Sequence, residues 1–123
     1  MNTLLTEPDI FRYEDYRRFL QDRFAELQSR DPGFSQRGLA RKAGIANPGF
    51  YNEVIKGRRR LSPAAAIKMC NGLNLSREES EYFSALVEYG EIREPDARLS
   101  AGQRLMNLRN QRLVQAFEET QLP

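Results

Sequence analysis

Hydrophobic residues recur three or four positions apart along most of the chain, the spacing that places them on one face of an α-helix. The alternating pattern typical of strands is not found. The spacing therefore predicts an all-α fold, in which five helices form a repressor-like unit and a sixth is appended at the C-terminus. The expected helices cover residues 13–28, 36–43, 48–56, 63–72, 77–90 and 100–120.

Capping residues support these boundaries. Ser35, Ser62 and Ser76 each precede a helical pattern, and serine is a favoured N-cap. Asn47 before a proline repeats the arrangement, and Ser100 begins an S-x-x-Q capping box. The predicted organisation is an N-terminal arm (1–12), a helix-turn-helix domain (13–90), a polar linker (91–99) and an amphipathic C-terminal helix (100–123).

The length of 123 residues fits one domain that buries a core without disulfides or metals. No apolar run approaches the roughly 18 residues that cross a membrane, and the N-terminus lacks the pattern of a secretory signal. Cys70 is the single cysteine, which suits a reducing cytoplasm. Its apolar neighbours predict a buried structural thiol.

The chain contains no histidine, the usual general base near neutral pH and the commonest metal ligand. With a single cysteine as well, zinc sites and Ser-His-Asp or Cys-His catalytic sites are excluded. Neighbouring acids such as Glu78 and Glu79 stand in helical contexts typical of solvated faces, and no glycine-rich phosphate loop occurs. We expect no enzymatic activity, no metal site and no cofactor.

Charge is distributed unevenly along the chain. Residues 35–62 contain seven basic residues and one acid, a net charge of +6, whereas residues 76–100 contain three arginines and seven acids, a net charge of −4. The whole chain carries only +2. Segregation of this kind indicates that one face binds a polyanion.

The basic region also contains a recognisable motif. The segment SQRGLARKAGIANPGFYNEVIKGRRRLSP, residues 35–63, combines two short helical patterns with a glycine turn. Gly44 can adopt the left-handed conformation of a tight turn, and Leu39, Ala40, Ile45 and Val54 are expected to pack between the helices. The segment resembles the helix-turn-helix of Cro and phage repressors.

The flanking sequence extends this resemblance to a bacterial family of transcriptional regulators, over about residues 10–90. The shared patterns are Y-x-D-Y-R-x-F-L at 13–20, G-x-R-x-L-S at 57–62 and E-Y-F-x-x-L-V at 81–87. The resemblance implies a DNA-binding domain, usually followed by a further domain. This chain stops soon after the helical region, as a short family member or a truncated chain would.

The helix expected at 48–56 has one apolar side and one outward side when its residues are placed 100° apart. The outward residues are Gly49, Asn52, Glu53 and Lys56. Asn52 can pair with adenine, Glu53 can accept from cytosine, and Lys56 can reach guanine or a phosphate. We favour sequence-specific binding of double-stranded DNA over binding dominated by phosphates. Because so few side chains can contact bases, we expect only moderate specificity.

The other candidate DNA contacts lie at helix starts and in the loop after the second helix of the motif. They are Gln36, Arg37, Asn47, Arg58, Arg59 and Arg60. Gln36 stands where exposed amides and the helix dipole attract a phosphate, or it is a plain surface residue. The arginines are expected to bind the DNA backbone; the alternatives are a solvated loop and an ion pair with the first or fifth helix.

The final helix carries an apolar side, and we expect it to pack on the first helix. The alternative is a homodimer through Leu105, Leu108, Leu113 and Phe117. A DNA-binding regulator is the favoured function. A protein-interaction module is the alternative, supported by the thin reading face, by the acidic surface of the fifth helix and by Phe11 and Tyr89, which look exposed. RNA binding is favoured least, because the basic region offers no clear aromatic stacking platform.

Overall fold

The structure is a computed structural model and describes residues 8–121. These residues form six α-helices and one short 3-10 helix, and no strand occurs among them. The predicted all-α fold with a C-terminal helix is confirmed. The elements are η2 (Ile10–Arg12), α1 (Tyr16–Arg30), α2 (Gln36–Ala43), α3 (Phe50–Ile55), α4 (Pro63–Gly72), α5 (Arg77–Glu91) and α6 (Pro95–Gln121).

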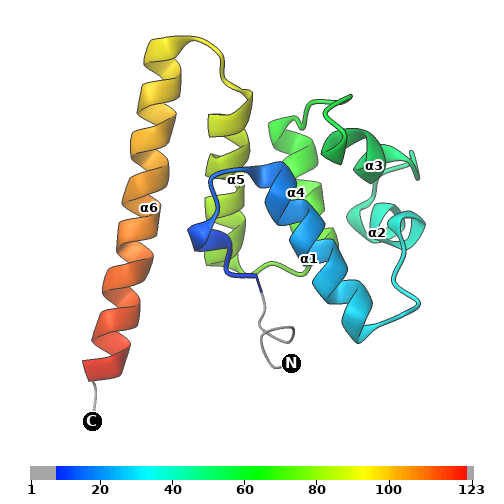
Figure 1. Cartoon of the computed structure of the whole chain (residues 1–123), viewed down its shortest axis with the longest axis horizontal. Coiled ribbons are helices and arrows are strands. Elements are labelled where there is room, and N and C mark those ends of the chain that lie inside the picture. Colours follow the sequence, from blue (N-terminus) through cyan, green and yellow to red (C-terminus); the bar gives the residue numbers. More distant parts are fainter. Residues whose placement is uncertain (1–7, 122–123) are drawn as a thin grey trace.

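The helices surround one hydrophobic core (Figure 1). Helix α6 runs along one edge of the molecule beside α5, α2 and α3 form the opposite edge, and α1 and α4 lie between. Large, fully buried side chains come from α1, α2, α4 and α5, which is why these helices hold together. They include Tyr16, Phe19, Leu39, Met69, Tyr82 and Phe83.

Serine side chains cap three helices at the predicted positions. The hydroxyls of Ser35 and Ser62 each accept a hydrogen bond from the amide three residues further on, at 3.0 and 3.1 Å. Ser76 and Glu79 form the complete capping box at the start of α5, with bonds of 3.1 and 2.8 Å. Each bond satisfies an amide that has no partner within the first helical turn.

Helix α3 starts later than the sequence predicts. It begins at Phe50 with Gly49 as its N-cap, and Asn47 is not the cap. The side-chain oxygen of Asn47 accepts from the Gly49 amide at 2.9 Å, and its carbonyl accepts from the Phe50 amide at 3.1 Å. These bonds close a tight turn in front of the helix. Asn47 therefore stabilises this turn and does not cap α3.

The predicted linker at 91–99 and the predicted helix start at Ser100 are wrong. Helix α5 continues through Glu91 and α6 begins at Pro95, so three residues join them. The carboxylate of Glu94 accepts from two amides in the first turn of α6, at 3.2 and 2.7 Å. This cap, followed by proline at the first helical position, starts the helix early. Residues 95–99 of the predicted linker therefore form the exposed start of α6.

The described part of the predicted N-terminal arm is packed. Ile10 is fully buried, and the ring of Phe11 lies 5.1 Å from that of Tyr82. Arg109 of α6 donates to the Phe11 carbonyl at 2.8 Å. Helix α6 therefore packs against α5 and η2, and not against α1 as the sequence suggested. Residues 1–7 of the predicted arm lie outside the described residues.

Helix α4 approaches α2 closely at Gly72. A Cβ atom at this position would lie 2.8 Å from Cδ1 of Leu39 and 3.0 Å from Cβ of Ala43. The helices meet where α4 lacks a side chain, and this contact seats α2 on the core.

Two sequence-based exclusions concern membranes and metals. No helix within residues 8–121 has the length and apolar character to cross a membrane. The same residues contain no cluster of three or more histidine, cysteine or acidic side chains that could hold a metal ion. Cys70 is buried, and burial raises the pKa of its thiol, which agrees with the predicted structural role.

Candidate nucleic-acid interface

The turn between α2 and α3 depends on Gly44. Its φ of 76° lies in the left-handed region, and its amide closes the last turn of α2. Glycine adopts this conformation without the steric cost that other residues meet. Leu39, Ala40 and Val54 are buried, and Ile45 packs against the same core. The residues predicted to pack between the two helices are therefore buried or partly buried.

Helix α3 has the two faces that the sequence predicts. Its buried side consists of Phe50, Tyr51 and Val54. The ring of Tyr51 stacks on that of Phe24 in α1, with centroids 4.7 Å apart, which fixes α3 against the core. Asn52 and Glu53 lie half-buried on the outward side, and Lys56 is exposed at the C-cap. Few side chains remain to reach a ligand.

The first residues of α2 lie beside its N-cap, Ser35. Gln36 is half-buried and Arg37 is exposed. The helix dipole and the amides of the first turn favour an anion near both side chains. Lys42, near the other end of α2, donates to the side-chain oxygen of Asn74 at 2.7 Å and so has a partner within the chain.

Two predicted contact residues neutralise each other. Nε of Arg59 lies 2.7 Å from the carboxylate of Glu53, and its guanidinium lies 5.3 Å from the ring centroid of Phe50. The acid on the reading face is thus masked by an arginine of the loop. Both side chains are substantially exposed, so the pair is a weak one that a stronger anion can replace.

Arg60 is held differently. Its Nε lies 3.1 Å from the carboxylate of Glu91, and Nη2 donates to the Glu91 carbonyl at 2.9 Å. An ion pair with the fifth helix was one of the alternatives for this loop. Within residues 8–121, Arg58 pairs with no carboxylate, and it is exposed. Of the three loop arginines, Arg58 is therefore available to a ligand, Arg59 is held in a weak ion pair, and Arg60 is bound to α5.

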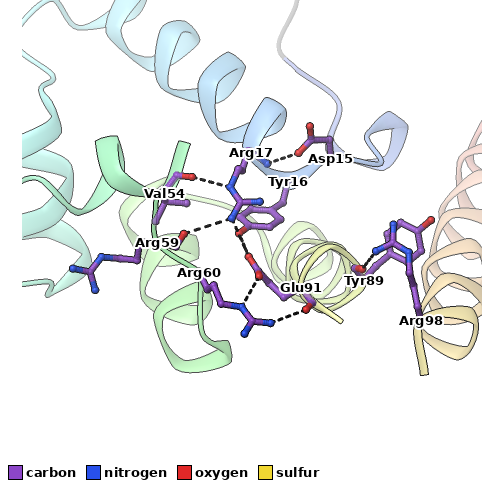
Figure 2. Close-up of polar contacts among 9 residues, drawn as sticks. All are labelled: Asp15, Tyr16, Arg17, Val54, Arg59, Arg60, Tyr89, Glu91 and Arg98. Atoms are coloured by element: carbon purple, nitrogen blue, oxygen red, sulfur yellow. Dashed lines mark hydrogen bonds and ion pairs between the residues drawn. The ribbon is translucent and has the colours of Figure 1, made fainter. Parts of the chain in front are cut away.

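Arg17 of α1 ties the end of α3 to the end of α5 (Figure 2). Its Nε donates to the Val54 carbonyl at 2.8 Å, and its Nη2 donates to the Glu91 carboxylate at 3.2 Å. A longer contact of 3.5 Å reaches the carbonyl of Arg59. A cation is favourable at the last carbonyls of a helix. This side chain fixes the position from which the arginine loop leaves α3.

Glu91 is the carboxylate on which these contacts converge. Burial raises the pKa of its carboxyl, but hydrogen bonds from Tyr16 and Arg60 and the charge of Arg17 outweigh it, so the pKa lies below the ordinary 4.5. Burial and the hydrogen bond to Glu91 raise the pKa of Tyr16. At neutral pH an ionised carboxylate therefore accepts from a protonated phenol and two guanidinium groups.

Sequence reasoning did not identify Arg17 and Glu91 as part of this site. Arg17 belongs to the Y-x-D-Y-R-x-F-L pattern at 13–20, to which no function was assigned. Glu91 falls in the predicted linker. A carboxylate at the last residue of a helix is unfavourable to the helix dipole unless cations surround it. That signal becomes readable only when the end of α5 is known.

Comparison with protein-family models, with characterised proteins and with solved structures finds no match to this chain.

Proposed function

We propose that the chain is a cytoplasmic regulator of transcription that binds double-stranded DNA through α2 and α3. The observation that carries the proposal is the division of α3 into a buried side and an outward side that ends in cations. Lys56 and Arg58, both exposed, flank the glycine that ends α3. Together with Arg37 they give this edge of the molecule its positive charge, which favours a polyanion.

The proposed contacts fall into two classes. Asn52 and Lys56 are the base-reading residues, because an amide can pair with adenine and an ammonium group with guanine in the major groove. Gln36, Arg37 and Arg58 bind phosphates and fix the register of the protein on the duplex. With so few readers, the affinity rests mainly on phosphates and falls as salt increases.

Glu53, Asn47 and Gly49 have other tasks in this proposal. Glu53 holds Arg59 until a phosphate competes for it. Asn47 shapes the turn before α3, since its side-chain oxygen is already bonded. Gly49 lets the backbone approach the DNA closely.

Selection of bound fragments from a random duplex pool tests the proposal. The wild-type chain is expected to enrich a short motif. Asn52→Ala and Lys56→Ala should change that motif more than they change total affinity, because each removes a base contact worth about 1–3 kcal/mol of discrimination. Lys68→Ala is a matched control, since this exposed lysine lies on α4 outside the proposed interface.

A protein-interaction module on the same scaffold is the second candidate. The observation favouring it is that two of the three loop arginines are already paired with carboxylates of the chain. Phe11 and Tyr89, which looked exposed in the sequence, no longer support this function. The ring of Phe11 packs on that of Tyr82, and the guanidinium carbon of Arg98 lies 4.2 Å from the ring centroid of Tyr89. If the selection enriches no motif and the chain binds no duplex at low salt, this second function replaces the first.

A further inference from the structure

An acid lies within the surface that is proposed to bind DNA. Glu53 is half-buried on the outward side of α3, between Asn52 and Lys56 in the sequence. The phosphates of a duplex repel its carboxylate. In the structure this charge is neutralised by Arg59, whose Nε lies 2.7 Å from a Glu53 carboxylate oxygen. The ion pair therefore determines what the outward side of α3 presents to a ligand.

The backbone beneath this ion pair is held in place. The Gly57 amide donates to the Val54 carbonyl at 3.0 Å, and Gly57 has a left-handed φ of 75°. The Arg58 amide donates to the Glu53 carbonyl at 2.9 Å, which completes a Schellman motif at the end of α3. The loop that carries Arg59 therefore leaves the helix in a fixed direction.

The side chains of the pair are free to separate. Glu53 and Arg59 are 40% and 45% exposed, and an ion pair in contact with water changes an equilibrium by about five-fold at most. The Arg59 guanidinium also lies 5.3 Å from the ring centroid of Phe50, a contact of similar weakness. Figure 2 shows Arg59 pointing away from Glu91, to which Arg60 is bound. A stronger anion can therefore take Arg59 from Glu53 without moving the loop.

We propose that Glu53 and Arg59 exchange partners when the chain binds its preferred duplex, and that the freed carboxylate selects cytosine. Arg59 moves to a phosphate of the DNA backbone. Glu53 then accepts a hydrogen bond from the N4 amino group of a cytosine in the major groove. The inference rests on the proposed function and adds a third base-reading residue to it.

The major-groove edges of the four bases explain the choice of cytosine. Cytosine presents an amino donor, whereas guanine presents two acceptors and thymine one acceptor beside a methyl group. Adenine places its donor next to the N7 acceptor, which repels the second oxygen of a carboxylate and suits the amide of Asn52 better. A carboxylate on α3 therefore has one clearly favourable base.

The exchange links base recognition to phosphate binding. At a site without cytosine, release of Arg59 would leave the Glu53 carboxylate among phosphates with no donor, so the ion pair stays closed. One phosphate contact is then missing, and the slope of log affinity against log salt is smaller by up to about 0.9. The acid thereby discriminates against other duplexes, which raises specificity more than affinity.

Salt titrations on two duplexes test the exchange. The first carries the motif enriched from the random pool; in the second, the C·G pair whose enrichment is lost with Glu53→Ala is reversed to G·C. By fluorescence anisotropy, the wild type should bind the second duplex several-fold more weakly and with a slope smaller by up to about 0.9. Glu53→Ala frees Arg59 on both duplexes, so their slopes should become equal and the affinity for the second should rise several-fold.

Glu88→Ala is the matched control. Glu88 forms an ion pair with Arg104 at 3.2 Å, and the two side chains are 51% and 48% exposed, but the pair joins α5 to α6. This variant removes the same charge and should discriminate between the two duplexes like the wild type. Unchanged helical circular dichroism shows that the variants fold.

Substitutions of the arginines separate the two halves of the exchange. Arg59→Ala should lower the slope on the first duplex and leave it unchanged on the second, where the wild type keeps Arg59 paired with Glu53. Arg58→Ala should lower the slope on both. Added to Glu53→Ala, Arg59→Ala should lower both slopes equally, because Arg59 is then free on both duplexes.

The stoichiometry of the complex is measured first, because each bound chain adds its own phosphate contacts. A homodimer through four residues of α6 was an alternative from the sequence. Leu105 is only 4% exposed and Leu108 packs against the core, so both stabilise the fold. Leu113 and Phe117 remain exposed. Titration at duplex concentrations far above the Kd gives the number of chains per duplex, and the slopes are compared per chain.

The outcomes separate this inference from the proposed function. A wild type that enriches no motif and binds no duplex overturns both. A motif with no C·G pair that depends on Glu53, equal slopes of the wild type on the two duplexes, or full discrimination by Glu53→Ala overturns the exchange and leaves DNA binding intact.

Discussion

The three arginines after α3 should contribute unequally to DNA binding, although the sequence makes them look alike. We consider Arg58→Ala, Arg59→Ala and Arg60→Ala separately. A phosphate contact of an arginine contributes about 0.9 to the slope of log affinity against log salt. Between about 50 and 200 mM salt, one such contact therefore weakens the affinity about 3.5-fold.

The free energy needed to release each arginine from its partner in the chain determines how much each substitution changes the slope. Among residues 8–121, Arg58 is paired with no carboxylate, so Arg58→Ala should reduce the slope by about 0.9. The exposed pair of Arg59 with Glu53 is worth about 0.2–1 kcal/mol, which a phosphate overcomes in part. Arg60 must break two hydrogen bonds at the negative end of α5, at a cost of about 1–2 kcal/mol.

We therefore expect the slope to change most for Arg58→Ala, less for Arg59→Ala and hardly at all for Arg60→Ala. Fluorescence anisotropy with a labelled duplex, titrated at five salt concentrations, measures the three slopes. Equal changes for all three would show that the internal ion pairs do not restrain the loop. A slope unaffected by Arg58→Ala would remove this loop from the interface.

Two further predictions concern the contacts that position this region. Glu91→Gln should lower the free energy of unfolding by about 1–3 kcal/mol at neutral pH, because it removes the charge that Arg17 and Arg60 contact. Since the folded pKa of Glu91 lies below 4.5, this stabilisation is complete above pH 4.5 and is lost as the pH falls through the folded pKa. Urea unfolding of both chains at several pH values should show the difference closing only in acid; a constant difference would contradict the assignment. Gly72→Ala should cost about 1–2 kcal/mol, because overpacking against Leu39 exceeds the gain in helix propensity. Gly33→Ala, at an exposed position, is the control, and an equal effect at both sites would refute a specific contact between α2 and α4.

Much of the fold follows from local pattern. The three serine caps and the Gly44 turn are determined by neighbouring residues, and they were predicted correctly. The buried side of α3 follows from helical spacing alone. Local chemistry is enough wherever a side chain bonds to its own helix end or turn.

The errors arise where a cap or a partner comes from outside the predicted pattern. Glu94 caps α6 before the S-x-x-Q box at Ser100, so residues 95–99 of the predicted linker belong to α6. Phe11 was predicted to lie in an arm outside the helical domain, because its partner, Arg109, is far away in sequence. Such contacts depend on tertiary packing, which a single sequence does not display.

The candidate site shows the same division. Its outward residues on α3 could be read from periodicity, and the basic loop from composition. The pairing of Arg59 with Glu53 and of Arg60 with Glu91 could not, because it depends on where α5 ends relative to α3. These pairs reduce the available charge of the loop and change which arginine is expected to bind phosphate.

Titration of the ¹⁵N-labelled chain with a duplex from the selection experiment tests the central claim most directly. We expect the largest changes in amide chemical shift at Gln36 and Arg37, along the outward side of α3 and at Arg58, with few changes in the C-terminal half of α6. A footprint centred on α6, or shifts absent from α2 and α3 at saturating DNA, would contradict the proposal that this helix-turn-helix is the DNA-binding surface.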